Sequence, residues 1–377
     1  MALSNVWWMQ DLQPTATQVI DPSKPHLAWP ANCGQVGISF HTLETYLHKH
    51  RNDNDFSIHK FTYTSMQWSY TQTLDDMRGL IKELKTGKRT SSNIFIMTKP
   101  CPEAVRALGH YLHITPRFFN FPYVPTSTGN HVAGYAFFHL QFMDMYPPKI
   151  KPSEAARNQN SPYAQFNLGQ GLTQHTWHIT KVDLIYWNDK IELTGSNRGM
   201  GLISLDPADD IIYKGLHKLM TRKETIPPGK WEEEFGLGQV LSEMFHIISV
   251  NWNAFLDEAE QHLQHISRTI TTTATTHEQQ KSYSLALHQL SPLWSEVRRR
   301  IVSAKDTAQQ MTTHPFFIAV GGEESISSYL KKIILTLNDY ETRTHELDTN
   351  TNILINLVSI PRDDSKYSLC VPFHSLV

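Results

Sequence analysis

Histidine, tryptophan and tyrosine side chains give this sequence most of its chemical potential. The 377 residues include 20 His, 9 Trp and 14 Tyr. Three residues of one apolar stretch, Lys181, His178 and Tyr186, could each donate a hydrogen bond to a carbonyl oxygen. Such a donor lowers the barrier of a reaction in which negative charge develops on that oxygen. We therefore take these three as the candidate catalytic residues.

Aromatic and polar residues around this stretch, and in a later helical segment, could line a cavity for an apolar ligand. An apolar wall with a few polar groups is typical of a small-molecule site. The alternative interpretation is that the aromatic residues simply pack in the core, as such residues usually do. The candidate substrate-binding residues are Trp177, Trp187, Tyr135, His139, Gln141, His246, Trp252 and Asn253.

Motifs for metals and nucleotides are missing from the sequence. It has no HExxH, EF-hand or cysteine-rich pattern, and no GxGxxG, Walker or GxSxG motif. Glu258, His262 and His265 have helical spacing and could approach a metal. A solvated helix face is the alternative explanation of that group. We therefore expect no metal and no cofactor.

Composition narrows the function classes. The formal net charge is −2, which argues against nucleic acid as a partner and against electrostatic attachment to a membrane. The N-terminal segment has no signal-peptide pattern, and no apolar run approaches the roughly 20 residues that span a bilayer. The 3 cysteines are far apart in sequence, which is typical of a reducing compartment. We expect a soluble, cytoplasmic protein.

Alternating strands and helices predict a mixed-sheet α/β domain in residues 1–230, with residues 1–60 irregular. A helix is expected from Thr73 to Gly87, because Thr73 can cap it and Gly87 can end it. Strands are expected at 92–100, 129–145, 175–187 and 199–207, and a helix at 101–114. Residues 146–170 are rich in Pro, Asn and Gln, and could form a lid.

Three long rows of apolar residues predict a bundle of three antiparallel helices over residues 236–366, followed by a tail at 367–377. The second and third rows have spacings that alternate between 3 and 4 residues. The third row runs from Leu330 to Val358 and includes Thr344 and Thr351 at apolar positions. These threonines favour a self-contained bundle, and a monomer slightly over an oligomer.

Four stretches resemble a known family. They are "ALGHYLHITPRFFNFPY", "GYAFFHLQFM", "RGMGLISLDP" and "YETRTHELDTNTNILINLVSIPRDDSK". Together they resemble the cytosolic part of CorA-type magnesium transporters over residues 70–366, and most of all the divergent fungal CorA-like proteins. The resemblance implies an α/β domain followed by long helices. In the transporters the last helix continues into two membrane spans with a Gly-Met-Asn signature, which we do not find here, so we expect no ion transport.

Two function classes stay open. The first is a cofactor-independent biosynthetic enzyme, a pericyclase or Diels–Alderase-type cyclase that holds an apolar small molecule in a reactive conformation and gives it one hydrogen-bond donor. The second is a divalent-cation sensor or a protein-interaction module without catalysis. The candidate carboxylates for cation sensing are Asp206, Asp209 and Asp210.

Overall fold

The structure is a computed structural model of the chain. It describes residues 25–29, 41–49, 55–64, 67–86, 92–99, 101–114, 116–119, 135–146, 165–166, 176–190, 197–206, 211–221, 236–272, 276–313 and 326–359. The predicted tail at 367–377 lies outside these residues, as does most of the predicted lid at 146–170.

The described part of the chain contains seven strands and a series of helices. The strands are β1 Ser57–Thr64, β2 Gln67–Leu74, β3 Ser92–Lys99, β4 Tyr135–Tyr146, β5 Gln165–Phe166, β6 Thr176–Lys190 and β7 Asn197–Asp206. The helices are η1 Pro25–Ala28, α1 His41–Lys49, α2 Met77–Thr86, α3 Pro102–Tyr111, α4 Pro116–Phe119, α6 Ile211–Thr221, α7 Gly236–Thr272, α8 His277–Thr313 and α10 Ile326–Ser359.

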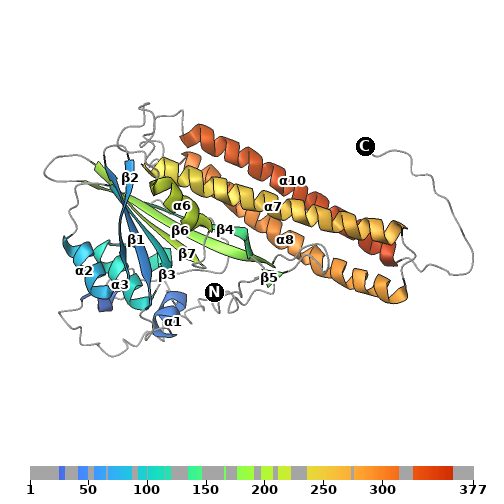
Figure 1. Ribbon diagram of the computed structural model, residues 1–377, viewed down its shortest axis with the longest axis horizontal. Coiled ribbons are helices and arrows are strands. Elements are labelled where there is room, and N and C mark those ends of the chain that lie inside the picture. Colours follow the sequence, from blue (N-terminus) through green and yellow to red (C-terminus); the bar gives the residue numbers. More distant parts are fainter. Residues whose placement is uncertain are drawn as a thin grey trace, which may run out of the picture.

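The strands form one mixed sheet in the order β2-β1-β3-β7-β6-β4, with β5 paired to β6. Strand pairs on both sides of the centre are antiparallel, whereas β3 and β7 run parallel. The sheet therefore consists of two antiparallel halves that meet at one parallel pair (Figure 1).

Residues of the central strands alternate between two cores. In β3, Ile94 and Ile96 belong to a cluster shared with the long helices, whereas Phe95 and Met97 belong to a second cluster with α2 and α3. Because successive strand residues point to opposite faces, a continuous apolar strand is buried on both sides. The sheet is thus a middle layer between the long helices and the smaller N-terminal helices (Figure 1).

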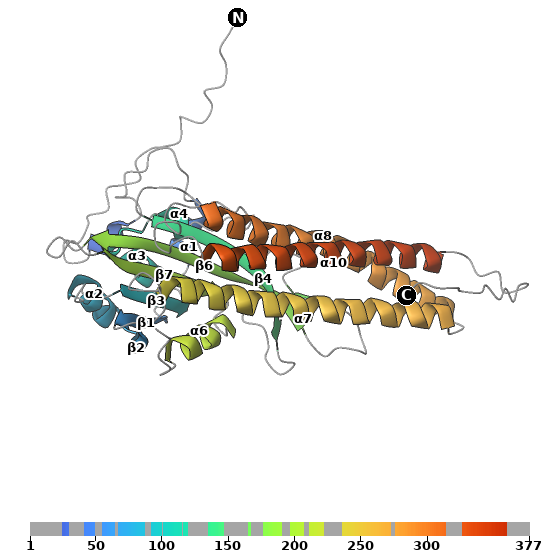
Figure 2. The same cartoon turned by 90° about the horizontal axis from the view of Figure 1, so that it is seen from above.

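The three long helices alternate in direction, so α7 and α10 are parallel and α8 is antiparallel to both. Contacts from α10 reach α8 through Glu341 and α7 through Arg343. Viewed from above, α10 lies between α7 and α8 (Figure 2). These elements confirm the predicted fold class, a mixed-sheet α/β part followed by three long antiparallel helices.

The helix predicted from Thr73 begins later. Thr73 belongs to β2, which continues to Leu74, and α2 starts at Met77. The Asp76 carboxylate accepts a hydrogen bond of 2.7 Å from the Gly79 amide, so an aspartate replaces the expected threonine as the side chain that pairs a free amide of the first turn.

Several elements were not predicted. Residues 1–60 were expected to be irregular, yet they contain α1 and the start of β1, and α6 follows β7. In β1 and β2, buried and exposed residues do not alternate strictly, so the two-residue period of a strand is weak in these segments. The division at residues 230–236 stays a prediction, because one apolar cluster includes residues of both the sheet and the long helices.

None of the described helices is both long enough and apolar enough to cross a membrane.

Candidate functional site

The three predicted catalytic residues all lie on β6. Lys181 is opposite Gln141 in the β4–β6 register, His178 is opposite Asp144, and Tyr186 is opposite Ala136. The structure describes the strand positions of these three residues and not their side chains, so their part in catalysis stays a prediction.

Four predicted binding residues lie on the same strand pair. Tyr135 and Trp187 are directly opposite each other in the register, and Gln141 is opposite Lys181. His139 is opposite Asp183. The structure describes their backbone positions and not their side chains, so their part in binding stays a prediction.

Two other predicted binding residues, Trp177 and Trp252, meet around one phenylalanine. The ring of Phe255 on α7 lies 5.2 Å from that of Trp177 and 6.2 Å from that of Trp252, between ring centroids. The ring of Trp294 on α8 lies 6.4 Å from Phe255. Two edge-to-face contacts and one tilted contact thus join β6, α7 and α8 into an aromatic cluster at the junction of sheet and helices.

The remaining two predicted binding residues lie elsewhere on α7. His246 and Asn253 are exposed. The Asn253 amide donates to Asp257 over 2.9 Å and accepts from Arg343 over 2.8 Å. Arg343 also binds Glu260 at 2.7 Å, so Asn253 is part of the polar contact between α7 and α10.

Beside the aromatic cluster, α7 carries buried polar side chains that we call the α7 polar stripe: Asn251 and His262, with Glu258 between them. Asn251 and His262 are 8% and 7% exposed. They are eleven residues apart, which is close to three helical turns, so they lie on one side of the helix over about 16 Å. Phe255 is only about 40° away around the helix axis. The stripe therefore flanks the side of α7 that contacts Trp177.

Several buried nitrogen atoms here have no hydrogen-bond partner among the described residues. They are Nδ2 of Asn251, Nε2 of His262, and the indole nitrogens of Trp177 and Trp252. Each such group costs about 1–3 kcal/mol if nothing binds it. Buried polar groups in native proteins are nearly always paired, so a cluster of unpaired ones needs an explanation such as a ligand or water.

His262 is neutral at pH 7. Burial, and next the nearby His265, lower the pKa of His262 from 6.5 to about 4. A neutral imidazole has one N–H donor and one acceptor nitrogen. Asn251 and His262 can therefore offer hydrogen bonds without adding a formal charge of their own.

The interpretation of Glu258, His262 and His265 as metal ligands gains no support. His262 is buried whereas His265 is exposed. Within the described ranges, no group of three His, Cys, Asp or Glu side chains is arranged to hold a metal ion. Asp209 and Asp210, the carboxylates considered for cation sensing, lie outside the described residues, as does the side chain of Asp206.

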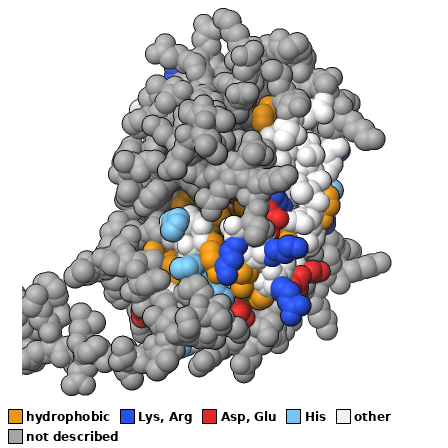
Figure 3. All heavy atoms as spheres, turned by 90° about the vertical axis from the view of Figure 1, so that its left-hand side faces the viewer, with side chains coloured by type: hydrophobic (Ala, Val, Ile, Leu, Met, Phe, Trp, Pro, Cys, Tyr) orange, Lys and Arg blue, Asp and Glu red, His pale blue; other side chains and the backbone are white. Residues whose placement is uncertain are grey.

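On the sheet end of the molecule, lysine, arginine, aspartate and glutamate side chains lie close together on the described surface (Figure 3). Lys60 and Glu83 form an ion pair of 2.6 Å between β1 and α2.

Sequence reasoning missed Asn251 and Phe255 as site residues. Phe255 was part of the predicted apolar row of the helix, and Asn251 sits beside that row. The available signal was the spacing of Asn251, Glu258 and His262, which places polar residues along the edge of an apolar face.

No family model and no curated protein matches this chain. Among solved structures, full-length CmaX is similar at 11% identity and a TM-score of 0.50, covering 81% of this chain and 78% of that one. The soluble domain of CorA from Methanocaldococcus jannaschii is similar at 11% identity and a TM-score of 0.49, over 80% of this chain and 96% of that one. The complete CorA magnesium transporter of the same organism gives 9% identity and a TM-score of 0.45, over 80% and 76%. At such identities, likeness to CmaX shows a shared fold and says nothing of activity.

Proposed function

We propose that this chain is a cofactor-independent small-molecule enzyme, a cyclase or isomerase whose substrate lies along the α7 polar stripe and the aromatic cluster. One observation carries the proposal. Four buried nitrogens, on Asn251, His262, Trp177 and Trp252, lack a partner among the described residues at the junction of sheet and helices. A bound carbonyl compound would supply the missing acceptors.

The chemistry of the stripe suits a reaction without a nucleophile. Aromatic walls hold an apolar substrate in a reactive conformation, which removes an entropic part of the barrier. Neutral N–H donors stabilise the charge that develops on a carbonyl oxygen in the transition state. Asn251, and His262 in its Nε2–H tautomer, are such donors. A Diels–Alder or related pericyclic ring closure needs no more than these two contributions.

Lys181, His178 and Tyr186 stay predictions as donors, because only their strand positions are described. The alternative function, cation sensing or protein interaction, has no specific contact among the described residues that favours it. The CorA structures supply a fold likeness below a TM-score of 0.5, so magnesium chemistry is not part of the proposal.

The test is a comparison of small-molecule extracts from the source organism with the gene intact, deleted, or replaced by His262→Leu or Asn251→Leu. We expect deletion to remove one product and to accumulate a precursor of identical mass. Both substitutions should give the same change, because each removes a donor and fills the site. His265→Leu is the matched control, since His265 is exposed on the same helix, and it should leave the product unchanged.

Two outcomes would contradict the proposal. If deletion changes no compound, the chain has no biosynthetic role in that organism. If the accumulated compound differs in mass from the product, the reaction is not an isomerisation. If deletion does accumulate a precursor of identical mass, purified chain and isolated precursor give a direct measurement. Wild type but not His262→Leu should convert precursor to product without added metal or nucleotide.

A further inference from the structure

A second polar cluster lies on the side of the sheet that α6 covers. Ser57 and His59 are on β1, Thr73 is on β2 and Tyr213 is on α6. The Ser57 hydroxyl oxygen lies 3.2 Å from Nε2 of His59. Nδ1 of His59 lies 3.0 Å from the Thr73 hydroxyl and 3.2 Å from the Tyr213 hydroxyl.

The two ring nitrogens of His59 thus have different partners. A neutral imidazole carries one N–H and one lone pair. The hydroxyl groups of Thr73 and Tyr213 can rotate to accept a proton carried on Nδ1, which leaves the lone pair of Nε2 facing Ser57. A serine beside a base that a third group orients is the general arrangement of an activated nucleophile.

The surroundings keep His59 available as a base. Burial, and next the nearby His217, lower the pKa of His59 below its ordinary 6.5. The rings of His59 and Tyr213 are 4.4 Å apart between centroids, and His217 lies 5.6 Å from Tyr213. Tyr70 on β2 completes the titratable groups around it, with its hydroxyl 2.6 Å from that of Thr73. No carboxylate is among these neighbours in the described structure.

We propose that Ser57 and His59 form a nucleophile–base pair that accepts acyl groups from small activated esters. This site is separate from the α7 polar stripe, and Ser57 is half-buried. Thr73 and Tyr213 are positioning residues, because they contact His59 and not the reacting atoms.

The reaction balances with water as its only co-reactant. As Oγ of Ser57 bonds to the acyl carbon, Nε2 of His59 takes the hydroxyl proton. The bond from the acyl carbon to the leaving alcohol then breaks, and that alcohol receives the proton from Nε2. Water attacks the acyl-serine by the same proton route, which releases a carboxylic acid and restores Ser57.

The test measures acetylation of the full chain by p-nitrophenyl acetate, with the modified residue located by peptide mass analysis. We expect Ser57 to react about a hundredfold faster than Ser69, since general-base assistance gives that factor or more. Ser69 is a matched control because it lies on β2 and donates to the Thr62 carbonyl over 3.2 Å, with no described base beside it. Ser57→Ala should abolish the fast labelling, and Ser69→Ala should leave it unchanged.

Three further measurements separate catalysis from structure. His59→Gln should slow Ser57 labelling about a hundredfold, and the wild-type rate should rise with pH and level off below pH 6.5, where His59 has lost its proton. Thr73→Val should change the pH at which the rate levels off. Equal labelling of Ser57 and Ser69 would overturn the proposal. So would an unchanged rate in His59→Gln at an unchanged thermal midpoint, or a wild-type rate without this pH dependence.

Discussion

Two buried regions of the long helices differ in whether their polar side chains have hydrogen-bond partners. Where α8 meets α10, the indole nitrogen of Trp294 donates to the Thr351 hydroxyl over 2.8 Å, and Thr351 donates onward to the Leu347 carbonyl over 2.7 Å. Along the α7 polar stripe, Nδ2 of Asn251 and Nε2 of His262 have no hydrogen-bond partner among the described residues. The first region is a complete network, whereas the second has buried polar atoms that the described residues leave unpaired.

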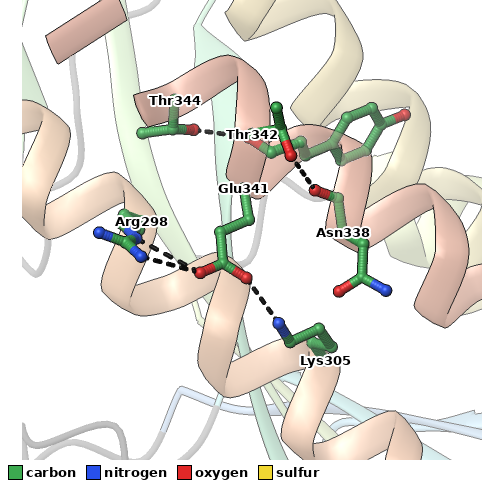
Figure 4. Close-up of polar contacts among 7 residues, drawn as sticks. Arg298, Lys305, Asn338, Glu341, Thr342 and Thr344 are labelled. Carbon is green, nitrogen blue, oxygen red and sulfur yellow. Dashed lines mark hydrogen bonds and ion pairs between the residues drawn. The ribbon is translucent and has the colours of Figure 1, made fainter. Parts of the chain in front are cut away.

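The polar contacts at the rim of the α8–α10 contact are also complete. Glu341 lies between Arg298 and Lys305, with distances of 3.2 Å and 2.5 Å (Figure 4). Thr344 donates to the Tyr340 carbonyl over 2.8 Å. Satisfied groups like these fix the geometry of a helix pair. The comparison therefore separates the α8–α10 pair, whose polar groups are satisfied, from the stripe on α7, where we propose that the substrate binds.

The largest expected effect that sharpens this comparison is the pH dependence of folding stability that His262 causes. Its pKa is lowered to about 4 in the folded chain and returns to an ordinary 6.5 on unfolding, so the proton binds the unfolded chain more tightly. The folded chain should lose about 3 kcal/mol of stability as pH falls from 6.5 to 4, at about 1.4 kcal/mol per pH unit. Urea unfolding at a series of pH values measures this loss.

His262→Leu is the variant that isolates this contribution. It should remove most of the loss of stability between pH 6.5 and 4, and it should be at least as stable as wild type at pH 7, because it removes an unpaired buried group. An equally steep loss in His262→Leu would show that other groups cause the acid sensitivity. His288→Leu, at an exposed histidine of α8, supplies the control.

A smaller effect tests the complete network. Thr351→Val keeps the shape of the side chain but leaves the indole N–H of Trp294 unpaired, so it should cost about 1–3 kcal/mol. Thr349→Val is the control, since Thr349 is exposed and its hydroxyl donates only to the His345 carbonyl. Chemical denaturation of both variants gives the difference. Equal stability of the two would break the distinction between the regions.

The smallest effect concerns the surface ion pairs. Glu341→Gln should cost about 0.5–1 kcal/mol at low salt and less at high salt, because half-exposed pairs are screened. Hydrogen bonding to Lys305 is the main cause that lowers the pKa of Glu341, so this stability is present at neutral pH and is lost as pH falls through that lowered pKa. Glu346→Gln, on the exposed side of α10, is the control in thermal unfolding at two salt concentrations.

The long helices could be predicted closely because their apolar rows persist over many turns. The third row, expected from Leu330 to Val358, lies within α10 at Ile326–Ser359. Periodicity over that length outweighs local preferences. By contrast, β1 and β2 were missed because hydroxyl and charged side chains interrupt their alternation, and pairing across the sheet decides such strands.

The candidate site could be predicted only in part, because residue types do not show which polar atoms will be hydrogen-bonded to one another. Trp177 and Trp252 were named as aromatic residues of a site, and the structure brings both to Phe255. Nothing in the residue types shows that the indole of Trp294 finds a hydroxyl acceptor while those of Trp177 and Trp252 find none within the described chain.

The parallel pairing of β3 with β7 has a consequence for how the chain folds. The strands on each side of this pair join through antiparallel neighbours, but Asn93 pairs with Met200, which lies 107 positions later in the sequence. Closing so long a loop costs chain entropy before the contact contributes any stabilising energy, and such distant pairings slow folding. The two halves of the sheet can each form from nearer segments, so we expect the β3–β7 pairing, which joins the two halves, to form late in folding.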